Sequence, residues 1–168
     1  LHTSGQVLRE IPLAQGWNWI SLNLSLPDPA INPVLGTLIH PEDDYIKSQA
    51  SFSEYFGSAW FGSLDTLGNT SMYQYRANLP DTLKLIGELI DPSMQPIPFT
   101  AGWNWISYLP NKPLPVDEAL VGLSPLTGDL IKGQFGFAQY IANFGWIGNL
   151  SHLMPPQGYQ LRMANAGV

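Results

Sequence analysis

Residues Gly16 to Ser21 read GWNWIS, and the same six letters return at Gly102 to Ser107. The sequence around both hexapeptides also matches: the beginning and end of the repeat align at an offset of 86 positions, and its middle part aligns at an offset of 85. The pairs at 86 include Ile11 with Ile97, Trp60 with Trp146, Gly62 with Gly148 and Tyr73 with Tyr159, and those at 85 include Asp44 with Asp129, Lys47 with Lys132, Gln49 with Gln134 and Tyr55 with Tyr140. The chain is therefore one module duplicated, and the residues kept in both copies rank the positions that matter.

Composition indicates a folded, loop-rich domain. The 168 residues are 45% apolar and only 12% charged, and they include 16 Gly and 15 Pro. This balance favours short strands joined by tight turns over helices or disorder. Each copy, at roughly 80 residues, is near the lower limit for an independent core. We therefore expect a mainly β fold with short helices, a β-rich α+β fold, in which two repeats related by a pseudo-twofold axis share a core and aromatic contacts.

The order of elements follows from apolar periodicity and turn residues. Residues 11–26 predict a strand, a turn at Gln15-Gly16 and a second strand, and each copy has three further short strands. Apolar spacing predicts short helices over 32–39 and 115–123. The stretch 83–90 predicts a strand or one helical turn that packs across the two halves. The expected organisation is a lead-in or edge strand at 1–10, the first copy at 11–76, a connector at 77–96, the second copy at 97–163 and a tail at 164–168.

Charge and residue usage exclude several classes of partner. The net charge is −6 and the pI is near 4.7, and the seven basic residues are scattered, so nucleic acid is not expected to bind. Cysteine is absent, which removes disulfides and thiolate chemistry. The sequence contains no apolar run of 18 residues, so we do not expect membrane insertion. The chain starts at Leu, and we interpret it as a piece of a longer protein whose export signal would lie outside it.

The residue pattern does not suggest an enzyme. His2, His40 and His152 lack counterparts in the other copy, no histidine pair has metal-ligand spacing, and no G-x-S-x-G motif is present. We expect no catalytic residue, no metal and no cofactor. Asp44 and Asp129 are retained acids, which we interpret as turn caps before a strand, with a calcium ligand as the alternative.

Aromatic and polar residues kept in both copies are the candidate binding residues. Trp17 and Trp19 are two apart on a strand, so they share one face, which is directed either to the core or to a sugar. The Gly in each W-x-G-x-L block lets a backbone or a flat ligand ring approach. Lys47 and Gln49 also share a face, as ligand contacts or as structural hydrogen-bonding groups. The candidate carbohydrate-binding residues are Trp17, Trp19, Lys47, Gln49, Tyr55, Trp60, Trp103, Trp105, Lys132, Gln134, Tyr140 and Trp146.

Five blocks of the second copy occur in order: PI-x-F-x-x-GWNWISY-x-P, V-x-EAL-x-x-L, GD-x-IK-x-Q-x-x-FAQY, GWIGNL and P-x-x-GY-x-L-x-M. This pattern resembles a repeat module of large secreted and cell-surface proteins of Bacteroidetes and related bacteria, where it accompanies immunoglobulin-like domains and sorting signals. The resemblance covers residues 97–163 closely and 11–76 more loosely, and it implies an extracellular, non-enzymatic module. The first copy departs from the pattern at 22–33 and 69–72, which implies unequal affinities if both copies bind.

Two functions fit these features. The first is a carbohydrate-binding module of a larger secreted protein, whose partners are a polysaccharide or glycan and the other domains of the parent chain. The second is a structural spacer or adhesin stalk domain in which the repeated residues are all core. The low charge and acidic pI favour a neutral glycan over a protein partner.

Overall fold

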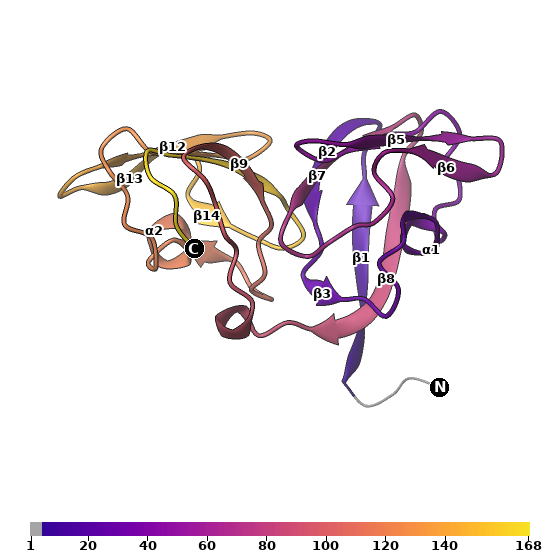
Figure 1. The fold of residues 1–168 in the computed structure, drawn as a ribbon, viewed down its shortest axis with the longest axis horizontal. Coiled ribbons are helices and arrows are strands. Elements are labelled where there is room, and N and C mark those ends of the chain that lie inside the picture. The colour runs from indigo at the N-terminus through magenta and orange to yellow at the C-terminus, as the bar shows by residue number, and fades with distance from the viewer. Residues whose placement is uncertain (1–4) are drawn as a thin grey trace.

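The computed structural model describes residues 5–168 as two five-stranded antiparallel sheets with the same strand order (Figure 1). The first sheet runs β2 (Gly16–Ser21), β7 (Met72–Ala77), β4 (Tyr45–Lys47), β5 (Phe52–Phe56) and β6 (Ala59–Gly62). The second runs β9 (Gly102–Ile106), β15 (Tyr159–Met163), β11 (Leu130–Lys132), β12 (Phe137–Ile141) and β13 (Gly145–Gly148). Each hexapeptide forms an edge strand of its sheet. The prediction of a mainly β fold is confirmed.

Retained residues close the same turns in both copies. The side-chain amide of Asn18 accepts from the Ala14 N–H at 2.9 Å and donates to the Ala14 carbonyl at 2.8 Å, so it closes the turn before β2. Asn104 makes the same pair of bonds with Thr100, at 2.8 Å each. The Asn in each hexapeptide is therefore a turn-closing residue.

The glycine in each W-x-G-x-L block is required because the backbone of a neighbouring strand lies where a side chain would begin. A Cβ on Gly62 would lie 2.2 Å from the Phe52 carbonyl oxygen, and one on Gly148 would lie 2.1 Å from that of Phe137. Of the two explanations the sequence left open, close approach of a neighbouring strand accounts for both glycines.

The strand, turn and second strand predicted over residues 11–26 are confirmed, but the two strands do not pair with each other. β1 (Gln6–Leu13) and β2 both form, but β1 pairs antiparallel with β8 (Asp81–Leu89), from Gln6 opposite Glu88 to Leu13 opposite Asp81. β3 (Leu24–Ser25) joins the other edge of β8. This three-stranded sheet lies beneath the first five-stranded sheet and covers its core face (Figure 1). The connector is thus a strand, and it belongs to the first copy rather than packing across the two halves.

The second copy has a thinner lower layer. Its parts are β10 (Leu114–Pro115), which pairs with β14 (His152–Leu153), and α2 (Val116–Ala119). The 3₁₀ turn Pro92–Met94 connects the two copies. Helix α1 (Ile31–Leu35) is the counterpart of α2 in the first copy, so both helices form where predicted but are shorter.

The apolar interior is divided, so the prediction of a shared core is wrong. One cluster of buried side chains draws its members from residues 11–85, and a second draws its members from residues 99–163. The aromatic pairs also lie within one copy each. The physical reason is that each sheet folds over its own helix and buries its apolar face locally. Two edge strands meet between the copies, and edge strands offer polar backbone groups.

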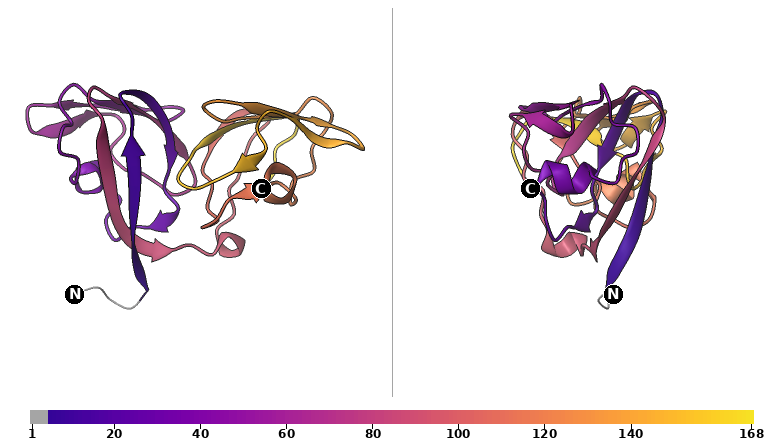
Figure 2. Two further views of the ribbon diagram at one scale, coloured as in Figure 1. Left: turned by 180° about the vertical axis from the view of Figure 1, so that it is seen from behind. Right: turned by 90° about the vertical axis from the view of Figure 1, so that its right-hand side faces the viewer.

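Reciprocal hydrogen bonds join the two copies at those edges. Gln134 accepts from the Trp19 N–H at 2.9 Å and donates to the Trp17 carbonyl at 2.6 Å. Gln49 accepts from the Trp105 N–H at 3.0 Å and donates to the Trp103 carbonyl at 2.8 Å. The sheets therefore lie side by side along one side of the molecule, as Figure 2 shows from behind. This pattern is what a pseudo-twofold relation would produce, and the axis itself stays a prediction.

Candidate functional site

The outer face of each five-stranded sheet, the face opposite the core, carries aromatic and cationic side chains. In the first sheet Trp17 stands opposite Arg76, which stands opposite Tyr45. The next row holds Trp19, Gln74 and Lys47. Side chains in register on neighbouring antiparallel strands are in contact range, so these rows form one surface. We call it the first outer face.

Two cations flank Trp17 on this face. The Lys47 ammonium lies 4.9 Å from the centre of the Trp17 ring and the Arg76 guanidinium lies 5.9 Å from it. Tyr45 meets Trp17 edge-on at 6.1 Å and stacks on Phe52 at 5.5 Å. Trp17 is nevertheless 41% exposed. The cluster is an aromatic surface, accessible to solvent, with two positive charges beside it.

The second copy repeats the cluster around Trp103, which is 38% exposed. Lys132 lies 5.4 Å from the ring centre and Arg162 lies 5.5 Å from it. The position of Tyr45 is taken by Leu130, so the second outer face lacks that ring. Both copies therefore present a Trp with a Lys and an Arg, in unequal aromatic surroundings.

The predicted site residues divide between two sides of each sheet. Trp17, Trp19 and Lys47 share the first outer face, and Trp103, Trp105 and Lys132 share the second, because residues two apart on a strand point the same way. Trp60 and Trp146 are buried, at 6% and 8% exposure. Tyr55 and Tyr140 are half-buried and meet those rings edge-on, at 5.6 Å in each copy. These four aromatic residues pack on the core side and do not line the outer faces.

Gln49 and Gln134 have a structural task in this arrangement. Each uses both its amide oxygen and its amide nitrogen on the backbone of the other copy's edge strand. The structural interpretation of the retained Gln is thus the one that the geometry favours. The Lys two residues earlier lies on the outer face with the Trp.

Sequence reasoning missed Arg76 and Arg162 as members of the clusters. Both are retained at an offset of 86, in YQYRA and YQLRM, so the repeat itself carried the signal. The missing information was the pairing of β7 with β2 and of β15 with β9, which places each Arg opposite a Trp.

The interpretation of the retained acids as caps of the turn before a strand holds for Asp129, which accepts from the Leu126 N–H at 2.9 Å, whereas the side chain of Asp44 binds groups 31 and 34 residues later in the chain. Asp44 accepts from the Asn78 N–H at 2.6 Å and from the Tyr75 hydroxyl, and Asp129 accepts from the Ala164 N–H at 2.8 Å. Burial raises the pKa of Asp44 above its ordinary value, against the lowering effect of these hydrogen bonds. His40 and His152 are exposed, and His2 lies outside the described residues. Across residues 5–168 no group of three metal-ligating side chains is found.

No helix within residues 5–168 has the length and apolarity needed to cross a membrane. The sequence matches no family model, no curated protein and no solved structure. The resemblance to the bacterial surface module therefore stays a prediction, and the outer faces have to be interpreted from their own chemistry.

Proposed function

We propose that the chain is a non-catalytic carbohydrate-binding module that takes a glycan across its two outer faces. The observation that carries the proposal is the cluster of an exposed Trp with a Lys and an Arg, present at equivalent positions of both sheets. A pyranose ring presents C–H groups on its faces and hydroxyls at its edge. The Trp ring suits the C–H faces of the sugar, and the neighbouring Lys and Arg donate hydrogen bonds to its hydroxyls.

The cations favour a glycan that carries carboxylates or sulfates. Four of the seven Lys and Arg residues flank Trp17 and Trp103, while the chain as a whole has a net charge of −6. Positive charge is thus concentrated beside the two exposed rings. Guanidinium groups pair with carboxylates in two-point geometry, which adds specificity to the charge attraction. The proposal of an acidic glycan replaces the neutral glycan expected from overall composition.

Two sites on one body suit a long polymer. The sheets lie along the same side of the molecule, so their outer faces point the same way (Figure 1). A polysaccharide that reaches both clusters gains from effective concentration without any new contact. Tyr45 and Phe52 extend the first cluster, whereas Leu130 leaves the second smaller, so we expect the first copy to bind more tightly. Extracellular location and attachment to other domains belong to the same proposal.

The second candidate is a structural spacer or adhesin stalk domain. The observation that favours it is the position of the cations, since Lys47 and Lys132 lie over the Trp rings where a sugar would stack. Under this alternative the clusters only stabilise the sheets, and soluble glycans do not perturb them.

The experiment is a titration followed by tryptophan fluorescence and acrylamide quenching. The panel contains polygalacturonate and alginate oligosaccharides beside neutral xylan, mannan, cellulose and chitin fragments. We expect a saturable change with an acidic glycan that weakens as salt is added, because exposed charges are screened. Trp17→Ala and Trp103→Ala should each weaken binding roughly tenfold, as removal of a central aromatic contact does.

The matched control is Phe144→Ala, which removes a 77% exposed ring outside both clusters. Binding that is equal in this variant and in the two Trp variants would contradict the assignment of the site. No response to any glycan, with folded protein, would favour the spacer.

A further inference from the structure

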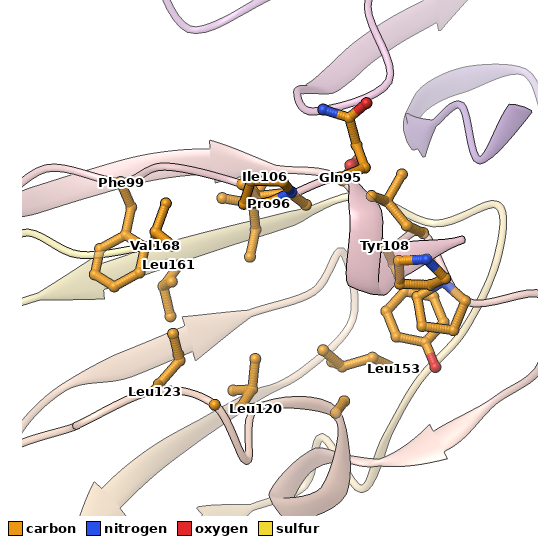
Figure 3. A pocket seen from close by; sticks show the side chains of 17 residues that line it. Gln95, Pro96, Phe99, Ile106, Tyr108, Leu120, Leu123, Leu153, Leu161 and Val168 are labelled. Atoms are coloured by element: carbon orange, nitrogen blue, oxygen red, sulfur yellow. The ribbon is translucent and has the colours of Figure 1, made fainter. Parts of the chain in front are cut away.

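The outer faces are open surfaces, so the side chains on them determine which ligand binds. A pocket of about 310 Å³ in the second copy lies on the core side of the sheet, among Phe99, Leu120 and Leu153 (Figure 3). Neither Trp103 nor Lys132 lines this pocket. A ligand of the outer face is therefore not enclosed by walls that exclude other molecules by shape. Its selection depends on the charged groups around the exposed ring.

The lysine of each cluster reaches its ring from two strands away. Lys47 of β4 is in the row of Trp19, yet its ammonium lies 4.9 Å from the centre of the Trp17 ring. Because β7 lies between β4 and β2, the ammonium and the ring meet above β7. In the second copy Lys132 lies 5.4 Å from the ring of Trp103 in the same way. The lysine therefore lies over the ring in both copies.

Neither lysine has an acidic partner in the described chain. Among residues 5–168 the one ion pair joins Lys84 to Glu10, on the three-stranded sheet. In the first copy Glu54 is a diagonal neighbour of Lys47 on the next strand, where a long side chain can reach it. The Lys47 ammonium lies over Trp17 instead. Its position is thus set by the aromatic ring, and its charge is free to pair with an anionic group of a ligand.

The arginine of each cluster has more contacts than the lysine. The Arg76 guanidinium lies near two rings, 5.9 Å from Trp17 and 5.5 Å from Tyr45. Arg162 donates to the Gly128 carbonyl at 3.0 Å in addition to its contact with the Trp ring. Within the part of the chain that the structure describes, each lysine ammonium has the ring as its single partner, at the end of a flexible four-carbon stem. The lysine is therefore the cation that can move when a ligand arrives.

We propose that Lys47 and Lys132 select acidic glycans over neutral ones, because each covers its Trp ring in the free protein and moves to an anionic group of the ligand when a sugar stacks there. This inference rests on the proposed function of the outer faces. A neutral sugar displaces the ammonium from the ring and offers it only hydroxyls in place of water, whereas an acidic sugar supplies an ionic partner. Loss of an exposed cation–π contact corresponds to roughly a two- to fivefold change in affinity, so the lysine weakens neutral binding by about that factor.

The test compares ligands that differ only in charge. Oligosaccharides of polygalacturonate and alginate are titrated beside the same oligosaccharides after reduction of their carboxyls to alcohols. Calorimetry measures their affinity for the full chain and for its variant with Lys47→Ala and Lys132→Ala. The control variant, with Lys84→Ala and Lys112→Ala, removes the same charge from exposed positions outside both outer faces.

We expect the Lys47→Ala and Lys132→Ala variant to bind the reduced oligosaccharides roughly two- to fivefold more tightly than the unaltered chain does. Its preference for the acidic forms should fall by up to about fivefold, the contribution of an exposed ion pair. The control variant should bind the reduced forms as the unaltered chain does. A lysine that only contacts sugar hydroxyls predicts the opposite sign, since its removal would weaken binding of both forms.

Weaker binding of the reduced forms to the Lys47→Ala and Lys132→Ala variant, or an unchanged preference for the acidic forms, would overturn the proposal and leave the glycan site in place. If no oligosaccharide binds the chain or its variants, the proposed function itself is overturned, and this inference with it.

A second measurement requires no glycan. In NMR spectra of the free chain the ε-methylene protons of Lys47 and Lys132 should show the upfield shift that the ring current of an indole produces. Trp17→Ala should remove this shift from Lys47, and Trp103→Ala should remove it from Lys132. Absence of the shift in the free chain would overturn the proposal even if glycans bind.

Discussion

Removal of the Gln134 side chain should loosen the contact between the two copies. Gln134 forms two hydrogen bonds with the edge of β2, at 2.9 and 2.6 Å. A typical hydrogen bond contributes about 0.5–1.5 kcal/mol, so Gln134→Ala should lower the free energy of unfolding by about 1–3 kcal/mol. Trp19 is half-buried, so water can reach its N–H in the variant, and the loss should lie in the lower half of this range. For a chain of this size, a loss in the lower half of the range lowers Tm by roughly 2–8 °C.

Urea unfolding measures the free energy, and hydrogen exchange locates the effect. In Gln134→Ala the Trp19 amide should exchange faster, while the Trp105 amide, which Gln49 holds in the other direction, should change less. Gln139→Ala is the control, because Gln139 is an exposed glutamine of the same copy. Equal stability of the two variants, or unchanged exchange at Trp19, would refute the view that retained Gln residues join the copies.

Three further predictions concern stability. Gly148→Ala should cost roughly 1–3 kcal/mol because its Cβ would meet the Phe137 backbone, whereas Gly122→Ala should cost almost nothing; equal urea midpoints would contradict this. Trp146→Ala should cost about 3–5 kcal/mol as a core truncation, and Trp103→Ala only about 0.5–1 kcal/mol as a lost cation–π contact; the reverse order in thermal unfolding would show that the faces are misassigned. Partial burial raises the pKa of Asp81, but hydrogen bonds from the backbone N–H groups of His40, Thr82 and Ile39 lower it by a larger amount. The pKa of Asp81 in the folded chain is therefore below its ordinary value of 3.8. Ionised Asp81 therefore stabilises the fold at pH values above its unfolded pKa, and this stability is lost as the pH falls through its folded pKa. Asp81→Asn should make the urea midpoint less sensitive to acid. An unchanged pH profile of the midpoint would argue against this contribution.

Many strands, turns and helices were predictable because the residues retained in both copies include those that determine local structure. The hexapeptide strands, the turns closed by Asn18 and Asn104 and the two helices all depend on residues close together in sequence. The apolar stretch at 83–90 predicted a strand or one helical turn, and the structure has the strand. These features are settled by backbone propensity and turn chemistry within a few residues.

The partner of each strand could not be predicted in the same way. β1 and β2 are neighbours in sequence, yet β1 pairs with β8 some 70 residues later, and this pairing depends on the whole packed layer. The same long-range choice places Arg76 beside Trp17 and Gln134 beside Trp19. Retention in both copies identified these residue types, but retention alone does not distinguish a surface cluster from a contact between copies.

The assignment of the outer faces as a glycan site is tested most directly by two-dimensional NMR of the six tryptophan indole N–H groups during titration with acidic oligosaccharides. We expect the signals of Trp17 and Trp103 to shift in a saturable manner, with Trp17 saturating first, while those of the buried Trp60 and Trp146 stay in place. Shifts at the buried rings alone, or no shift at any indole, would contradict the assignment of the outer faces as the glycan site.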